Sequence, residues 1–247
     1  MPQLATPLLL AALLLSAATA TAQTTFRLGL RGGANRAATT LAAASNTSET
    51  FFSISADKAA IYGWQAGVAA EVAFGKWALQ PALVFSQKGE KFHTVIASRD
   101  SGFPSLADQT STNRYNWLEL PLNLVYTMHG DHGLQLFAGP YVALGVGGRA
   151  KGSALFNSSG ILGPHTQAID DQINYGTDTN NRRLDAGINF GIGYRQGPVQ
   201  VQVGYGLGLR NLHQTSGDEV ADRIHNFGAD AAYNRVAQLT GTYFFNL

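Results

Sequence analysis

The chain contains no cysteine, so no disulfide can stabilise it and no cysteine follows the N-terminal segment to carry a lipid anchor. Charged residues make up only 13% of the sequence, and the formal net charge is +1. Nucleic-acid-binding proteins usually show a clustered basic face, so this composition argues against that class. Beyond the N-terminal segment, no apolar run reaches the roughly 18 residues that a membrane helix needs. The stability of the chain must therefore come from a sheet or a folded core.

The N-terminus carries the pattern of an export signal. Residues 8–18 read "LLLAALLLSAA", which has the length of a signal-peptide apolar region, and "ATAQ" offers a cleavage site after Ala22. The preceding "MPQ" lacks the usual Lys or Arg. An uncleaved membrane anchor is the alternative, although the run is short for a spanning helix. The sequence predicts a signal peptide over residues 1–22 and one exported domain over residues 23–247.

Apolar and polar residues alternate with period 2 in eight segments of the exported domain, which predicts strands. In segment 199–210, for example, Val, Tyr and Leu side chains occupy one face while Gln, Gly and Arg occupy the other. The segments run about 10 to 15 residues, whereas soluble strands usually have about 5 or 6. They cover residues 26–36, two strands within 61–89, 114–128, 133–147, 184–195, 199–210 and about 233–247.

The connections between these segments alternate in length. Three are only a few residues long ("GK", "HGDHG" and "QGP"), and the others are polar loops. Loops of roughly 20 to 35 residues are uncommon in a compact soluble domain. Short turns on one side and long loops on the other are typical of bacterial outer-membrane barrels. The sequence therefore predicts an all-β, eight-stranded antiparallel up-and-down transmembrane β-barrel, with short periplasmic turns and long extracellular loops.

Aromatic residues on the apolar faces gather at the two ends of the strands, as the interfacial girdles of a membrane barrel do. The apolar faces are accordingly expected to point into lipid. Near the short turns lie Phe26, Phe74, Trp77, Tyr126, Tyr194 and Phe245, and near the long loops lie Tyr62, Trp64 and Phe85.

The other face of each strand carries Gly, Gln, Asn and isolated charges. An eight-stranded barrel has an interior just wide enough for side chains to fill, and buried charges need partners. We therefore expect a structural network of arginines and carboxylates in the lumen. Its predicted members are Arg27, Arg31, Glu71, Glu119, Asp185, Arg195 and Arg210. Trp117 is also expected to point inward.

Three prolines, Pro81, Pro121 and Pro140, fall inside predicted strands. Every strand of a closed barrel is paired on both sides, and proline lacks the backbone N–H that pairing uses. These positions are expected to be bulges or places where the hydrogen-bond ladder is locally interrupted.

Several of these motifs resemble a family of Gram-negative outer-membrane β-barrel domains, often labelled PorT-like or "porin family". They are "FRLGLRGGAN" (26–35), "LQPALVFSQKG" (79–89), "WLELPLNLVY" (117–126), "FAGPYVALG" (137–145) and "DAGINFGIGY" (185–194). The resemblance spans essentially the whole mature chain and implies residence in the outer membrane. It departs at Ala82, where the family commonly has an acidic residue after Gln-Pro. The C-terminal "GTYFFNL" also departs from the usual terminal aromatic of an assembly signal.

Little in the sequence points to chemistry. Metal binding by His129 and His132 would need further ligands, and metal sites normally have three or four. The acidic loop residues Asp170, Asp171, Asp178, Asp218, Glu219 and Asp222 lack calcium-loop spacing. Neither a nucleophile motif nor a phosphate loop is found. We expect no enzymatic activity and no cofactor.

The expected role is structural or surface interaction through the long loops. Expected partners are outer-membrane lipid, lipopolysaccharide and, during biogenesis, the barrel-assembly machinery, without nucleic acid. A narrow channel for small solutes, an outer-membrane enzyme acting on lipid, and a soluble periplasmic β-barrel or sandwich with its apolar face inward are the alternatives.

Overall fold

The computed structural model describes residues 24–41, 46–48, 52–98, 105–158, 163–175, 182–212 and 232–246. The predicted signal peptide, residues 1–22, lies outside these ranges. So do four acidic loop residues of the sequence prediction, Asp178, Asp218, Glu219 and Asp222. Within the described ranges, none of the secondary structure is a helix long and apolar enough to span a bilayer.

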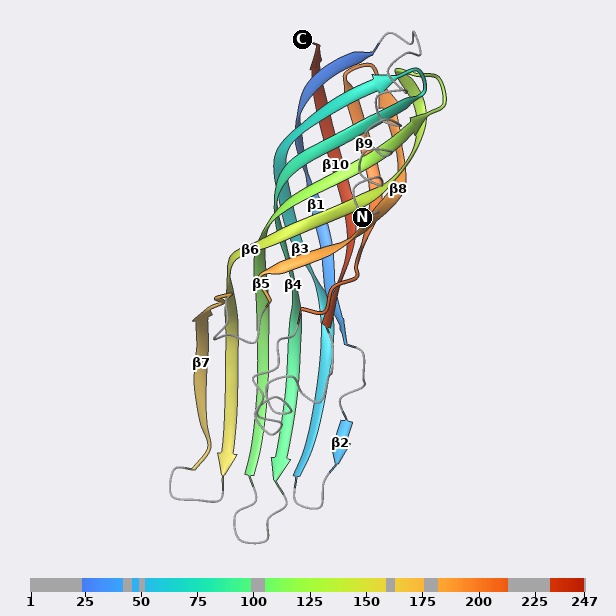
Figure 1. Ribbon diagram of the computed structural model, residues 1–247. Coiled ribbons are helices and arrows are strands. Elements are labelled where there is room, and N and C mark those ends of the chain that lie inside the picture. The colour runs from blue at the N-terminus through green and yellow to red at the C-terminus, as the bar shows by residue number, and fades with distance from the viewer. Residues whose placement is uncertain are drawn as a thin grey trace, which may run out of the picture.

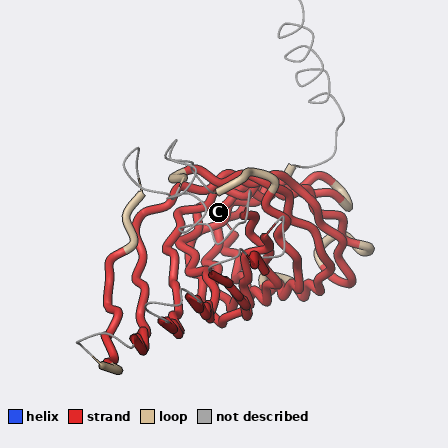
Figure 2. The backbone as a smooth tube through the Cα atoms, turned by 90° about the horizontal axis from the view of Figure 1, so that it is seen from below, coloured by secondary structure: helices blue, strands red, loops and turns tan. Residues whose placement is uncertain are grey.

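Eight long strands form a closed antiparallel ring (Figures 1 and 2). The order around the ring is β1, β10, β9, β8, β6, β5, β4 and β3, and the pairing of β1 with β3 closes it. Two shorter strands, β2 (Asn46–Ser48) and β7 (His165–Gln172), lie outside the ring. The ring strands are β1 (Thr25–Leu41), β3 (Phe52–Phe74), β4 (Trp77–Ser98), β5 (Ser105–Thr127), β6 (His132–Ser158), β8 (Leu184–Gln196), β9 (Val199–Gly208) and β10 (Ala232–Asn246).

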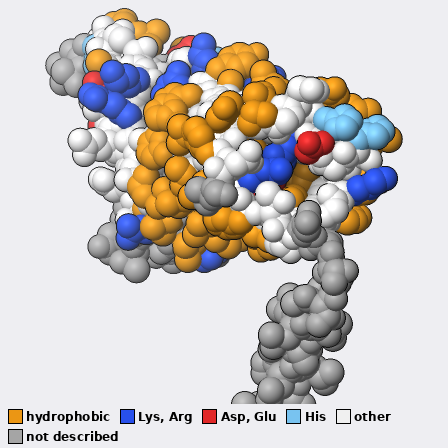
Figure 3. Space-filling model, turned by 90° about the horizontal axis from the view of Figure 1, so that it is seen from above, with side chains coloured by type: hydrophobic (Ala, Val, Ile, Leu, Met, Phe, Trp, Pro, Cys, Tyr) orange, Lys and Arg blue, Asp and Glu red, His pale blue; other side chains and the backbone are white. Residues whose placement is uncertain are grey.

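The apolar faces point outward, as the alternation predicts. Leu120 is 54% exposed, whereas its neighbour Glu119 is 4% exposed, and the same alternation runs along β8 and β9. Seen from the short-turn end, apolar side chains cover much of the barrel wall (Figure 3). The eight-stranded barrel is therefore confirmed, and the soluble alternative with an inward apolar face is wrong.

The two-residue turn between β3 and β4 is set by a glycine. Gly75 has φ of +64°, in the left-handed region where glycine carries no Cβ penalty. Phe74 pairs directly with Trp77 across this turn. The turn therefore fixes the register that places Trp77 on the lipid side.

Within the described ranges, part of the sequence that was expected as long loops is strand. Residues 90–98, 105–113 and 148–158, expected as loops, continue β4, β5 and β6 far beyond the ring, and β7 pairs with the end of β6. With β3 and β2 they form a sheet that projects from the barrel (Figure 1). We call this six-stranded part the extracellular sheet. Outside the membrane both sheet faces can be polar, so the lipid-facing alternation that identifies barrel strands is absent.

Two irregularities mark the place where the barrel becomes the sheet. The β3–β4 register shifts between Ala60 and Gln65, and the β5–β6 register shifts between Asn116 and Trp117. Opposite the second shift, Gly147 has φ of +143°. Bulges bend the strand that carries them, so these two shifts accompany the change in strand direction.

The three prolines occupy adjacent strands and interrupt the ladder without shifting it. On β3, the two residues between Ala69 and Val72 have no pairing partner on β4, where Pro81 lies opposite them. The register of β3 with β4 is the same on either side of this gap. An equivalent gap in the pairing of β5 with β4 lies beside Pro121, and one in the pairing of β6 with β5 lies beside Pro140. Each proline keeps its other neighbour, so the expected local interruption is confirmed and no bulge is present at these sites.

Candidate functional site

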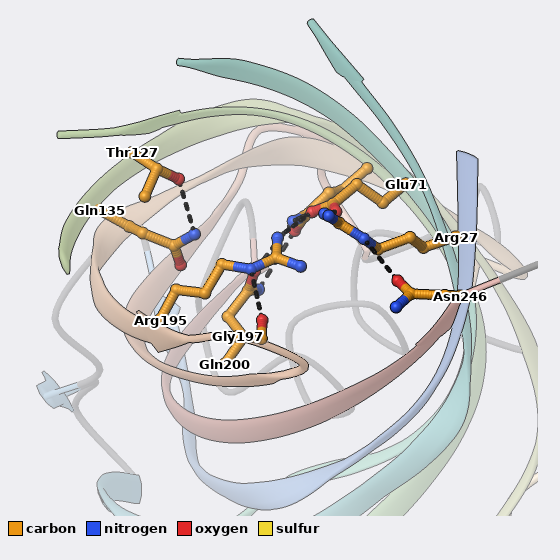
Figure 4. Close-up of polar contacts among 9 residues, drawn as sticks. Arg27, Glu71, Thr127, Gln135, Arg195, Gly197, Gln200 and Asn246 are labelled. Carbon is orange, nitrogen blue, oxygen red and sulfur yellow. Dashed lines mark hydrogen bonds and ion pairs between the residues drawn. The ribbon is translucent and has the colours of Figure 1, made fainter. Parts of the chain in front are cut away.

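The periplasmic end of the lumen is crossed by a cluster centred on a buried carboxylate. Glu71 is fully buried, and it accepts hydrogen bonds from Arg27 Nη1 at 2.8 Å and Arg195 Nη1 at 2.5 Å (Figure 4). Arg27 also donates to Asn246, and Arg195 to the carbonyl of Gly197. We call Arg27, Glu71 and Arg195 the lumen triad. Because a buried charge without partners is costly, each member holds the others in place.

Neutral amides cross the lumen beside the triad. Gln80 Nε2 donates to Glu71 at 2.7 Å and to Gln200 at 2.9 Å, and Gln200 donates back to Gln80 at 3.2 Å. Gln80 is on β4 and Gln200 is on β9, four places apart in the ring of eight strands. These side chains therefore join opposite walls of the barrel.

A second amide cluster lies further along the lumen. Gln65 Nε2 donates to Asn35 Oδ1 at 2.7 Å, and Asn35 Nδ2 donates to Ser86 at 3.0 Å. Arg31, which is 8% exposed, donates to Thr240 at 3.3 Å. Buried polar side chains, many of them hydrogen-bonded, thus fill the lumen along its length, as its diameter predicts.

The extracellular end of the lumen has its own charged cluster. Lys88 Nζ lies 2.7 Å from Glu119 and 5.1 Å from the ring centre of Tyr141. Tyr141 and Asn234 both donate to Asp185 Oδ2, at 3.1 and 2.8 Å. Farther from the short turns, Lys58 pairs with Glu90 at 3.2 Å. A small pocket remains between these residues and Trp117 and Tyr175, whose tilted rings have centres 5.4 Å apart.

Six of the seven predicted lumen residues point into the barrel, but they do not form one network. Arg27, Glu71 and Arg195 are joined, whereas Glu119 pairs with Lys88 and Asp185 binds neutral partners. The placement of Arg210 in the lumen is wrong. It is exposed because β9 ends at Gly208, so the alternation no longer applies at Arg210.

The prediction of lumen charges omitted Lys58, Lys88 and Glu90. Lys88 lies on the same inward face as Gln80 and Ser86, so the alternation already placed it in the lumen. Lys58 and Glu90 lie in the part of the chain that was expected to be loop. Only the extension of β3 and β4 brings these two residues together.

The aromatic residues form two groups on the outside of the barrel. Near the short turns, Trp77 and Tyr126 lie with ring centres 5.0 Å apart, and Phe26, Phe74, Tyr194 and Phe245 are also exposed. Near the extracellular sheet, Tyr62 is 72% exposed, and Trp64 lies 5.2 Å from Phe85. These positions match the two interfaces that aromatic side chains prefer.

The extracellular sheet carries ion pairs on its outward face. Arg149 donates to both carboxylate oxygens of Asp170, at 2.5 and 2.8 Å, and His93 lies 2.9 Å from Asp108. The hydrogen bonds from Arg149 lower the pKa of Asp170 below its ordinary value. The pair joins β6 to β7 on a solvated surface, where such pairs contribute little to stability.

The candidate metal residues do not gather. His129 and His132 stack with ring centres 5.3 Å apart, and His132 bonds to Asp131, whose pKa is lowered by that hydrogen bond. Asp170 is occupied by Arg149. Nowhere in the described part of the chain do three or more His, Asp or Glu side chains form a group that could hold a metal ion.

A family model described as "Outer membrane protein beta-barrel domain" matches residues 21–214. No curated protein matches the chain. Among solved structures, Ail of Yersinia pestis aligns at 10% identity over 90% of this chain and 99% of its own, with a TM-score of 0.42. Neisserial surface protein A aligns at 11% identity over 88% and 97%, also with a TM-score of 0.42. The translocator domain of NalP from Neisseria meningitidis aligns at 10% identity over 98% and 96%, with a TM-score of 0.27.

The family match covers most of the chain and agrees with the lipid-facing barrel. It places the protein in the outer membrane, as the sequence predicts, while the narrower PorT-like resemblance stays a prediction. The chain belongs to the family of outer membrane protein beta-barrel domains.

Proposed function

We propose that this protein is a surface-interaction barrel that presents its extracellular sheet to protein partners. The observation that carries the proposal is the free edge of β7. Among the described strands, β7 pairs only with β6, so its other edge offers unpaired backbone groups. An extended segment of another protein can add to such an edge by backbone hydrogen bonds.

The side chains of β7 support this proposal. Its sequence is "HTQAIDDQ", and seven of its eight residues are exposed, with Ile169 intermediate. The strand is short and polar, which limits indiscriminate aggregation while leaving the edge accessible. Specificity would then come from side chains on alternate faces of the added strand.

Transport and catalysis receive less support. The lumen triad and the Gln80–Gln200 pair occupy the periplasmic end of the lumen, and the Lys88–Glu119 pair occupies the other. Many polar residues within the barrel make ion pairs and hydrogen bonds that join its walls. We accordingly propose a structural role for the lumen and no enzymatic activity.

The test uses the full mature chain in lipid nanodiscs and proline substitutions at two adjacent positions, Ala168→Pro and Ile169→Pro. In an antiparallel strand the amides of neighbouring residues point to opposite sides, so one variant blocks the free edge and the other disturbs pairing with β6. Binding to an array of immobilised secreted proteins and extended peptides is measured by surface plasmon resonance.

The free-edge variant should lose binding while its cold-gel mobility and its circular dichroism spectrum stay like wild type. Asp131→Asn, in the periplasmic turn, is the control and should bind normally. Binding that survives both proline variants would contradict recognition through the β7 edge.

A further inference from the structure

A group of cations on the outward face lies outside the lumen and away from the free edge of β7. Its five members are all exposed and lie on β1, β4, β5 and β6, near the end of the barrel from which the extracellular sheet projects. We call them the basic patch: Arg36, Lys91, Arg114, Arg149 and Lys151.

Strand register brings like charges together in this patch. Arg114 on β5 is the direct cross-strand partner of Arg149 on β6. Lys91 and Lys151 both pair with Thr112, from its two sides. Like charges directly opposite one another destabilise a sheet, so this arrangement has a cost unless an anion lies between them.

Among the described residues, only Arg149 of the patch is in an ion pair. Asp170 binds Arg149 and also lies near Lys151. Arg114 instead donates to neutral oxygens, the carbonyl of Tyr62 at 3.0 Å and the side chain of Gln87 at 3.1 Å. Among the described residues, Arg114 makes no ion pair, and its remaining donors are free to face outward.

The aromatic residues next to the basic patch indicate where it lies relative to the membrane surface. Arg36 pairs directly with Tyr62, and Trp64 lies two residues further toward the short turns. Lys91 pairs with Ala59, three residues beyond Tyr62, which corresponds to about 10 Å along a strand. Aromatic girdles lie at the level of lipid headgroups, so the patch lies at that level or just above it.

We infer that the basic patch binds the phosphate groups of lipopolysaccharide in the outer leaflet. Arginine presents a planar fork of donors that matches phosphate oxygens, and lysine adds a point charge. A phosphate between Arg114 and Arg149 relieves the repulsion of this cross-strand pair. The inference rests on the membrane placement of the barrel and is independent of any protein bound at β7.

The test measures binding of fluorescent bis-phosphorylated lipid A to the mature chain in uncharged detergent micelles. The same lipid without its phosphates is the ligand control. The patch variant is Lys91→Gln/Arg114→Gln, which removes two cations that make no ion pair among the described residues. The matched control is Lys76→Gln/Arg210→Gln, which removes two exposed cations outside the patch.

The patch variant should bind lipid A roughly ten- to thirtyfold more weakly, since each cation near an anionic lipid surface contributes on the order of 1 kcal/mol. The matched control should bind like wild type. Asp170→Asn should strengthen binding, because it removes the acid that competes for Arg149. A purely structural patch would not give opposite effects for these two variants.

Three results would overturn the inference. The first is equal affinity for lipid A with and without phosphates, and the second is unchanged affinity in the patch variant. The third is displacement of lipid A by a sulfated oligosaccharide at the same concentration, which would identify the patch as a site for soluble polyanions. Cold-gel mobility of every variant establishes that each barrel is folded, and none of these assays contains a β7 partner.

Discussion

Arg195 and Glu71 form an ion pair across the full width of the barrel. Their atoms lie 2.5 Å apart although the residues are separated by 124 positions in the chain. Arg195 is on β8 and Glu71 is on β3, four places away in the ring of eight strands. The contact therefore forms only when the ring has closed, and it ties together walls that share no backbone hydrogen bond.

The first prediction concerns the charge at the centre of this contact. Glu71→Gln leaves Arg27 and Arg195 buried without their counter-charge, and we expect a loss of about 3–5 kcal/mol in the free energy of unfolding. Urea titration in detergent, followed by tryptophan fluorescence, measures it. Asp108→Asn removes an exposed partner of His93 and should cost less than about 1 kcal/mol. Equal losses in the two variants would refute the role of burial.

The second prediction concerns two tryptophans on opposite faces of the barrel wall. Trp117 is 2% exposed and packs against Tyr175, whereas Trp64 is 51% exposed on the lipid side. Trp117→Ala leaves a cavity and should cost about 3–5 kcal/mol. Trp64→Ala should cost clearly less in the same unfolding assay. A larger effect at Trp64 would mean that the assignment of inner and outer faces is reversed.

The third prediction tests whether the lumen is closed. Single-channel recording in a planar bilayer should show no steady conductance for the wild-type protein, because side chains cross the lumen. Arg195→Ala/Gln80→Ala removes two of the crossing side chains and should produce small conductance steps. His129→Ala/His132→Ala, in a periplasmic turn, serves as the control and should stay closed. Conductance in the wild-type protein would favour the channel alternative.

The fourth prediction is a pH dependence in the extracellular sheet. Because Arg149 lowers the folded-state pKa of Asp170, the pair favours docked β7 above the ordinary aspartate pKa of about 3.9. This contribution is lost as the pH falls through the lowered pKa. Carboxyl carbon NMR should give a pKa for Asp170 below the ordinary value. Arg149→Gln should return it to that value, and an unchanged titration would contradict the ion pair.

The barrel could be predicted from the sequence because lipid imposes a strict rule on its outer face. Every second residue of β9 must be apolar, and the alternation from Val199 to Leu207 shows it directly. The same rule placed Trp117 and Glu71 inside. The alternation could not predict that Glu71 pairs with Arg195. That contact depends on the order of the strands around the ring and on how far each strand is shifted along its neighbours. It also failed for residues 90–98, where the strand leaves the lipid and Lys91 and His93 interrupt the apolar outward face.

The extracellular sheet rises from only part of the ring, since β3, β4, β5 and β6 continue while β1, β8, β9 and β10 end near the barrel. The part of the molecule outside the membrane is therefore asymmetric about the barrel axis. Among the described residues, a large partner that approaches from the side of β3 to β6 meets the extracellular sheet, whereas one that approaches from the side of β8 to β10 meets strands that end near the barrel. The rotation of the barrel about its axis thus determines which neighbouring molecules the extracellular sheet can contact. A neighbouring membrane protein that prevented this rotation would fix the side of the barrel on which the sheet can bind a partner.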